Sequence, residues 1–446
     1  MTDRTPEHEP GPVPLGATPT GEVRARWAWV EPTVWSERMR TALENGVEGG
    51  RWYSLIDKVY AMRTLRAAFA AVKANRGAAG VDHQTIERYE AKLEWNLGRL
   101  SEQLRSGSYR PQAIRRVWIP KAGKRREMRP LGIPTVRDRV VQAALRIVLE
   151  PIFERDFAEQ SYGFRPGRGA KDALRRVDTL LKAGRTWVVD ADIRSYFDTI
   201  PHGPLMQLIR GKVADGRVLA LTEQFLTQPV LETAAAWTPE TGSPQGAVLS
   251  PLLSNIYLDP LDHAMADAGF EMVRYADDFV VLCESRSEAE RALAAIHEWM
   301  AAAGLTLHPE KTCIVDATER GGFDFLGYHF ERGKRWPSKK SMGKLRTAIR
   351  AKTRRANGAS FEAIVNHVNQ TLRGWYVYFQ HSLPNTFPGV DGWVRMRLRS
   401  ILRKRRRGRG RGRGEDHHRW PNVFFAGHGL YSLAVAHASA CPSSRR

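Results

Sequence analysis

Cysteine is scarce in this chain, and its apolar runs are short. Only Cys283, Cys313 and Cys441 occur among 446 residues, and no two of them are close in sequence. This usage excludes a Cys-x-x-Cys zinc site and argues against a disulfide framework, which suits a reducing cytoplasm. The N-terminus has no apolar signal core, and no uninterrupted apolar run is long enough to span a membrane. We therefore expect a cytoplasmic protein with no membrane partner.

Acidic residues are also few relative to basic ones. The chain has 69 Lys and Arg against 48 Asp and Glu, which leaves a formal net charge of +21. A field of that sign attracts polyanions, and nucleic acids are the usual soluble ones. A structural protein of the ribosomal kind and a protein that binds anionic membranes remain as alternatives. The apolar fraction of 42% is ordinary, so most of the chain is expected to fold.

Composition and periodicity divide the chain into four segments. Residues 1–33 are rich in Pro, Gly, Thr and Glu without apolar periodicity, and they are predicted to be a disordered tail. Residues 34–335 mix short strands with helices, which favours an α+β palm-like domain over a doubly wound sheet. Residues 336–400 are basic with helical periodicity. Residues 401–446 begin with an Arg-Gly run and are predicted to be a flexible segment that binds DNA or RNA.

Local patterns predict individual elements. Residues 186–193 read as a largely buried strand. Ser287 and Glu290 have the spacing of a capping box and predict the start of a helix, which Gly304 would end. Apolar residues at helical spacing over residues 361–379 predict another helix, whose apolar stripe we assign to a helical-bundle core.

Three acidic residues carry the candidate chemistry. Asp192 ends the predicted strand, and Asp277 and Asp278 lie between apolar residues on both sides. Adjacent residues of a straight strand face opposite ways, so an Asp-Asp pair converges on one site only at a turn, which predicts a hairpin. Clustered carboxylates require a cation, and Mg²⁺ prefers oxygen ligands. Two such ions about 3.5–4 Å apart promote in-line phosphoryl displacement. Taken alone, the pair favours a solvated turn, and the apolar flanks and the partner strand reverse that interpretation.

Tyr275-Ala-Asp-Asp278 resembles the Tyr-x-Asp-Asp box of reverse transcriptases, and further blocks of that family follow in its order over about residues 75–330. The closest resemblance is to bacterial group II intron reverse transcriptase/maturases, and it extends through the C-terminal third. It implies an α+β right-hand polymerase with fingers, palm and a helical thumb. It also implies that Asp192, Asp277 and Asp278 are catalytic and bind two Mg²⁺ ions, with Mn²⁺ as a substitute.

Two further blocks resemble nucleotide-binding motifs of the family. Residues 119–134 resemble the fingers motif over the incoming nucleotide, and its cations suit a triphosphate. Lys121 and Arg129 match best, while other basic residues between them remain competitors: Lys124, Arg125 and Arg126. In the Gly242–Gly246 block, Gln245 would contact the sugar and Gly246 would let the base pair lie flat.

Two single residues have implied roles in the reaction. Phe197 stands five residues after Asp192, where the family places an aromatic gate that selects deoxynucleotides; an ordinary core Phe is the alternative. Lys311 lies in a block that resembles the family's next motif, which implies that it protonates the departing pyrophosphate.

Basic residues outside these blocks are the expected nucleic-acid contacts. Residues 161–169 resemble the template-contacting block, which implies phosphate contacts by Arg165 and Arg168. Residues 372–379 resemble the maturase-specific thumb helix. The remaining candidates lie on basic stretches near and beyond it: Lys344, Arg350, Arg354, Arg405 and Arg407. The ending over residues 420–430 resembles intron proteins that lack an endonuclease, and without a zinc-knuckle cysteine set we expect no HNH domain.

The resemblance implies an RNA-directed DNA polymerase that is also a maturase. Its partners would be its own group II intron RNA, a DNA target or primer strand, and dNTPs; the sequence does not define an oligomeric state. Three alternatives are a domesticated or antiphage reverse transcriptase without an intron, a non-catalytic RNA-binding splicing factor, and an RNA-dependent RNA polymerase. The three acidic residues disfavour the second, and Phe197 disfavours the third.

Overall fold

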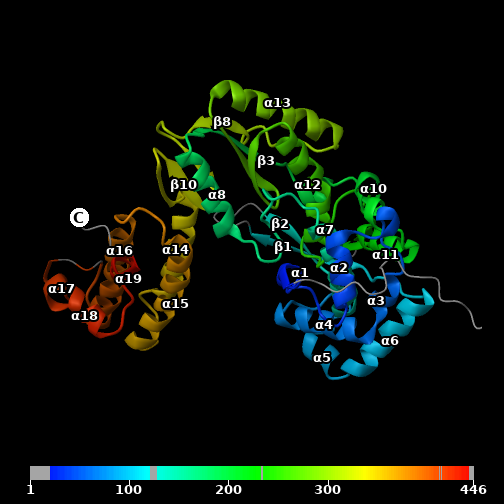
Figure 1. The fold of residues 1–446 in the computed structure, drawn as a ribbon. Helices are drawn as coiled ribbons and strands as arrows, with labels where there is room; N and C mark the ends of the chain where they lie inside the picture. Colours follow the sequence, from blue (N-terminus) through cyan, green and yellow to red (C-terminus); the bar gives the residue numbers. More distant parts are fainter. Residues whose placement is uncertain (1–20, 121–127, 233–234, 411, 413, 441–446) are drawn as a thin grey trace, which may run out of the picture. The chain divides into compact units, whose positions relative to one another are not determined.

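A computed structural model describes residues 21–120, 128–232, 235–410, 412 and 414–440 (Figure 1). The chain forms two compact units. Among the described residues, the first comprises 21–120, 128–177 and 189–314, and the second comprises 178–188 and 315–440, apart from the gaps just given. The main division therefore lies near residue 315, about twenty residues before the boundary predicted at 335.

The N-terminal part of the first unit is more ordered than we predicted. Helix α1 (Gly21–Arg26) is followed by Trp27 and Val30, which are both buried. The Trp27 indole N–H also donates to Glu44 at 3.0 Å. The prediction of a disordered tail is therefore wrong for residues 21–33. A few isolated aromatic and aliphatic side chains anchor this segment, and their spacing has no period that the sequence would reveal. Residues 1–20 lie outside the described residues.

A helical bundle builds the rest of this region. One face of helix α4 carries apolar residues at helical spacing, and this face is buried. Its apolar residues are Leu65, Ala68, Phe69 and Val72. This face packs on α7, and α3 and α6 pack beside them (Figure 1). The helices of the region are α2 (Glu37–Asn45), η1 (Glu48–Gly50), α3 (Ile56–Tyr60), α4 (Met62–Ala74), α5 (Ile86–Glu90), α6 (Leu93–Ser106) and α7 (Val136–Glu154).

Two four-stranded sheets follow. The first has the order β2-β1-β4-β5, with β1 antiparallel to β2 and parallel to β4. The second has the order β6-β7-β3-β8, and α12 and α13 pack against β6 and β7. The strands are β1 (Ile114–Pro120), β2 (Met128–Ile133), β3 (Trp187–Asp192), β4 (Val230–Glu232), β5 (Ala235–Trp237), β6 (Glu271–Tyr275), β7 (Asp278–Cys283) and β8 (Cys313–Asp316). The helices among them are α8 (Ala170–Lys182), α9 (Tyr196–Thr199), α10 (His202–Lys212), α11 (Gly216–Leu226), α12 (Ser250–Asp267) and α13 (Arg286–Ala302).

The α+β fold class is confirmed, and so is the strand predicted over residues 186–193, which is β3. The predicted helix after Cys283 is α13, but its capping pair is different. Ser285 caps it by accepting from Glu288 N at 3.2 Å, and Glu288 Oε2 accepts from Glu284 N at 2.8 Å. The helix thus begins two residues earlier than predicted. Ser285 and Glu288 have the same capping-box spacing as Ser287 and Glu290, so spacing alone does not distinguish the two pairs.

The second unit combines a three-stranded antiparallel sheet with helices. Its strands are β9 (Phe323–Phe325), β10 (Tyr328–Glu331) and β11 (Lys334–Pro337), in the order β11-β10-β9. Three long helices follow: α14 (Lys339–Lys352), α15 (Phe361–Phe379) and α16 (Thr386–Arg405). The helix predicted over residues 361–379 is α15, and its apolar stripe lies in the core as expected.

The C-terminal segment is not the flexible arm that we predicted. Three short helices follow the Arg-Gly run: α17 (Gly414–Arg419), α18 (Asn422–Gly427) and α19 (Leu433–Ala440). Trp420, Phe425 and Leu433 are buried in one core with α14, α15 and α16. Arg403 also forms an ion pair with Asp416 at 2.5 Å. The prediction is therefore wrong for residues 414–440, because apolar residues after the basic run anchor the segment.

Candidate active site

The Asp277–Asp278 pair lies at the tip of a hairpin in the second sheet. Strands β6 and β7 are antiparallel, and Tyr275 pairs with Asp278, so the loop consists of Ala276 and Asp277. Ala276 has a φ of 60°, and a positive φ at the first loop residue is characteristic of type II′ hairpin turns. The predicted strand-turn-strand hairpin is confirmed, and the turn takes Asp277 out of the alternation of the strand.

Asp192 ends β3, which is the neighbour of β7 in the same sheet. The segment before Lys311 runs alongside this end: Arg194 N donates to Thr306 O at 2.9 Å, and His308 N donates to Asp192 O at 2.7 Å. This pairing brings the Lys311 ammonium into an ion pair with the Asp192 carboxylate. The end of β3 therefore carries an acid and a cation side by side.

Asp192 and Asp277 are close enough to interact electrostatically. Burial raises the pKa of the Asp277 carboxyl, and the negative charge of Asp192 raises it further. The backbone N–H of Asp277 and the cations Arg274 and Lys311 act in the opposite direction. A partly buried carboxyl whose charge is disfavoured by a neighbouring carboxylate forms an arrangement that a divalent cation would relieve.

The donor set fits a hard cation in part. Among the residues that the structure describes, no three His, Cys, Asp or Glu side chains converge as a complete metal-binding group. Mg²⁺ in phosphoryl-transfer sites commonly takes only one or two protein carboxylates, with substrate phosphates and water completing its shell. Asp192 and Asp277 meet that requirement, while the participation of Asp278, the next residue, stays a prediction.

The glycine-rich loop over residues 242–246 lies against Phe197. Ser243 N donates to Phe197 O at 2.7 Å, and a Cβ on Gly242 would lie 2.8 Å from the same oxygen. Phe197 itself is half-buried on α9, with its ring 5.6 Å from that of Tyr196. The structure thus brings two predicted nucleotide-binding blocks together through their backbones.

The same loop also contacts β2. Gly132 N donates to Gln245 O at 2.7 Å, and a Cβ on Gly246 would lie 2.6 Å from Gly132 O. Gly246 has a φ of 106°, so it needs glycine for conformation as well as for space. Arg129 is exposed on β2, opposite Ile119 of β1. Lys121 and its competitors 124–126 lie outside the described residues.

Arg165 does not fit the predicted role of a phosphate contact. Its guanidinium is buried and is occupied by Glu154 at 2.7 Å and by backbone carbonyls, including Ala158 O and Ser161 O. Arg165 therefore stabilises the fold of the segment over residues 154–165. The prediction that it contacts nucleic acid is wrong. Arg168 is partly exposed and pairs with the exposed side chain of Glu159 at 2.5 Å, which a phosphate could replace.

The basic candidates of the second unit are at its surface. Arg350 is exposed on α14, 5.9 Å above the ring of Trp393. The Arg405 guanidinium donates to the carbonyl of Ala359. The exposed cations of α14 and the turn after it are Lys339, Lys340, Lys344, Arg346, Arg350 and Arg354, and Arg405 and Arg407 are exposed at and after the end of α16. All five predicted contacts in this unit are therefore accessible to a polyanion.

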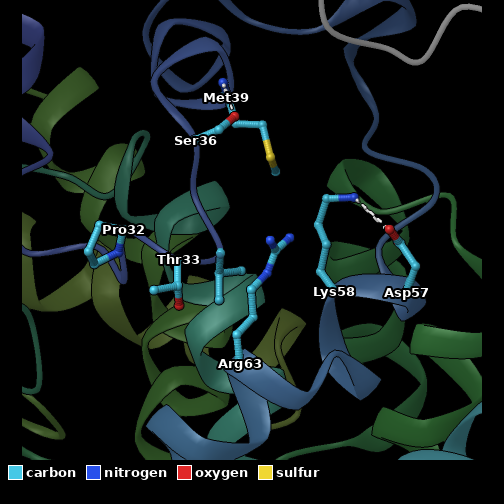
Figure 2. A pocket seen from close by; sticks show the side chains of 8 residues that line it. Pro32, Thr33, Ser36, Met39, Asp57, Lys58 and Arg63 are labelled. Atoms are coloured by element: carbon cyan, nitrogen blue, oxygen red, sulfur yellow. Dashed lines mark hydrogen bonds and ion pairs between the residues drawn. The ribbon is translucent and has the colours of Figure 1, made fainter.

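A separate hollow of about 510 Å³ lies among the N-terminal helices (Figure 2). Arg63 extends into the space between Met39 and Lys58, and Lys58 pairs with Asp57 at 3.3 Å. The hollow contains none of the predicted site residues.

Sequence reasoning missed one buried group beneath the hairpin. Arg274, Asp262 and Asn255 are all buried, and Arg274 donates hydrogen bonds to both of the others. A signal was available, since Arg274 directly follows the apolar pair Met272 and Val273 in a predicted strand, and a charged residue there is rarely buried unless it is paired.

Two family models match the chain. Residues 119–330 match the model described as reverse transcriptase (RNA-dependent DNA polymerase). Residues 342–420 match the model described as group II intron, maturase-specific domain. The first match contains the hairpin, β3 and the glycine-rich loop, and the second contains most of α14 and all of α15 and α16.

Similar individual proteins support these two family matches. Protein YkfC of Escherichia coli is 33% identical over 292 residues, which is 57% of this chain and 76% of that protein. The group II intron-encoded protein LtrA of Lactococcus lactis subsp. cremoris is 39% identical over 197 residues, 44% of this chain and 32% of LtrA. An uncharacterized 91 kDa protein in the cob intron of Schizosaccharomyces pombe is 31% identical over 331 residues, 60% of this chain and 40% of that protein. The match thus spans less than half of the two intron proteins. The chain belongs to the reverse transcriptase family, in the group whose members also carry a group II intron maturase-specific domain.

Proposed function

We propose that this chain is an RNA-directed DNA polymerase that extends a DNA primer with dNTPs on an RNA template. The observation that carries the proposal is the Tyr275–Asp278 hairpin, whose Asp277 interacts with Asp192 at the end of the adjacent strand. Members of this family use divalent ions, and a carboxylate pair beside a cationic side chain is suited to bind them with a triphosphate.

The residues of the site have distinct proposed roles. Asp192, Asp277 and Asp278 would hold two Mg²⁺ ions, or Mn²⁺, which would supply positive charge at the primer hydroxyl and the triphosphate. Lys311 is held beside Asp192 and would donate a proton to the departing pyrophosphate. Arg129 and Lys121 would bind the triphosphate from the fingers.

Three residues would position the nucleotide. Gln245 would contact the sugar, and Gly246 would leave room for the base pair because it has no side chain. The ring of Phe197, whose backbone carbonyl accepts from the same loop, would exclude a 2′-hydroxyl, so deoxynucleotides would be selected. Arg168 would contact the template phosphates after releasing Glu159.

We further propose that the second unit binds group II intron RNA and assists its splicing and mobility, with a DNA target strand as the primer. The exposed cations of α14 and the turn after it support this proposal, because they lie on a domain of the maturase-specific family and suit phosphate groups. Relatives in E. coli and L. lactis support a bacterial cytoplasmic setting. Among the helices that the structure describes, none is long and apolar enough to cross a bilayer.

Two activities measured on one preparation test this proposal. The purified chain should accelerate splicing of the intron that surrounds its reading frame at low Mg²⁺, and a Lys344→Ala, Arg350→Ala, Arg354→Ala triple variant should lose this effect while still extending oligo(dT) on poly(rA). The Asp277→Asn variant should show the opposite pattern. Extension without any effect on intron RNA would instead favour a reverse transcriptase that has no intron.

A further inference from the structure

The hairpin that carries Asp277 rests on a fully buried arginine. Arg274, three residues before Asp277 on β6, is 0% exposed. Its Nε donates to Asp262 Oδ1 at 2.7 Å, and its Nη2 donates to the other carboxylate oxygen. Asp262 comes from α12 and is also 0% exposed. This bidentate pair satisfies one edge of the guanidinium and leaves Nη1 for other partners.

The remaining nitrogen of Arg274 is directed to the catalytic turn. Its Nη1 donates to Ala276 O at 2.9 Å and to Asn255 Oδ1 at 3.1 Å. Ala276 is the first residue of the two-residue loop, directly before Asp277. The guanidinium therefore bonds to a backbone atom of the strained turn, where Ala276 adopts a positive φ.

Asn255 extends the same network to a second segment. Its Nδ2 donates to Gly163 O at 2.8 Å. The chain around Gly163 is paired with β6, because Arg274 N donates to Gln160 O and Tyr162 N donates to Arg274 O, each at 2.9 Å. The turn is thus held by Arg274 from its own strand and by the 160–163 segment from the side.

We propose that Arg274 and Asn255 are positioning residues for polymerisation, which fix the turn so that Asp277 meets Asp192. This inference rests on the proposed polymerase activity. A buried ion pair alone contributes little net stability compared with well-packed apolar residues. The two bonds from Nη1 are not needed to neutralise Asp262: one holds the backbone of the catalytic loop at Ala276 O, and the other holds the Asn255 side chain.

The Arg274→Lys variant separates charge from positioning. Lysine keeps the positive charge opposite Asp262, but its single ammonium cannot reproduce the planar fork that reaches Asp262, Asn255 and Ala276 O together. We expect kcat for oligo(dT) extension on poly(rA) to fall about 100-fold, with the KM for dTTP and the RNA affinity changed less than about twofold. The Mg²⁺ concentration for half-maximal rate should rise about tenfold.

Asn255→Ala is the second variant, because it leaves the Arg274–Asp262 pair intact and should give the same pattern. Two matched controls come from the other unit. Arg399→Lys changes a buried arginine that donates to Trp420 O and Asn422, and Asn369→Ala changes a buried asparagine that donates to Gly429 O. Both controls should retain wild-type kcat once it is normalised to the folded fraction from thermal unfolding.

The outcomes are distinguishable. If the wild-type chain does not extend the primer, the proposed polymerase activity fails, and the inference with it. If the wild type is active and both variants keep its normalised kcat and Mg²⁺ dependence, the inference alone is wrong. It is also overturned if the variants lose activity only in proportion to their unfolded fraction, as a purely structural arginine would.

Discussion

Replacing Gly163 by alanine should misplace the catalytic turn. A Cβ at Gly163 would lie 2.2 Å from Ala276 N, 2.8 Å from Tyr275 C and 3.0 Å from Ala276 Cα. All three atoms belong to the backbone, so no side chain can rotate away. Ordinary contact begins at 3.4 Å, so the turn and the 160–163 segment must separate by about 1.2 Å. The φ of Gly163 is not positive, so the effect of the added methyl group is purely one of space.

A displacement of this size at a reacting group can cost about 100-fold in rate. We therefore expect Gly163→Ala to lower kcat for dTTP incorporation on poly(rA)/oligo(dT) about 100-fold, with a small change in KM, because the nucleotide-binding loop is not touched. Gly98→Ala is the matched control: Gly98 lies in α6 with nothing within 4 Å of its added Cβ. Normal kcat in a folded Gly163→Ala variant would refute the claim that this close approach sets the position of Asp277.

Three further outcomes are expected. Phe197→Ala should raise the ratio of ribonucleotide to deoxynucleotide kcat/KM about tenfold or more, and an unchanged ratio would remove Phe197 as the gate. Leu433→Ala should destabilise the second unit by about 2–5 kcal/mol in denaturant unfolding, because Leu433 is 0% exposed, whereas Val435→Ala at a 66% exposed position should have little effect. Arg350→Ala should lower the slope of log affinity for intron RNA against log salt by about one if Arg350 contacts a phosphate, and an unchanged slope would exclude that contact.

The sequence predicted the hairpin and helix α15 because both depend on local patterns. Apolar residues on each side of Asp277 and Asp278 required a turn, and β6 and β7 are paired around that turn. The period of the apolar residues over 361–379 was sufficient to define α15. Each of these patterns is contained within about twenty residues, so no tertiary information was needed.

The errors arose where tertiary contacts override composition. Trp27 and Phe425 are buried in segments that look mobile by composition, because one or two large apolar side chains can anchor a short helix. Arg165 looked like a phosphate ligand in a glycine-rich block, yet Glu154 pairs with it from the end of a helix eleven residues earlier. Sequence spacing gave no indication of that pair.

The positioning network could be predicted only in part. Arg274 next to the apolar residues Met272 and Val273 indicates that a buried partner exists, but not that the partner is Asp262 twelve residues away. Nor does any pattern predict that Asn255 reaches Gly163, 92 residues away in sequence. Such contacts depend on the packing of α12 against β6, which is a property of the folded unit.

The most direct test of the central claim is primer extension by the Asp277→Asn variant. Asparagine preserves the size of the side chain and the turn but removes the charge that a divalent ion requires. We expect oligo(dT) extension on poly(rA) to be lost with Mg²⁺ and with Mn²⁺, while intron RNA binding and thermal stability stay at wild-type levels. Full extension by this variant would contradict the assignment of the Asp277 hairpin as the polymerase centre.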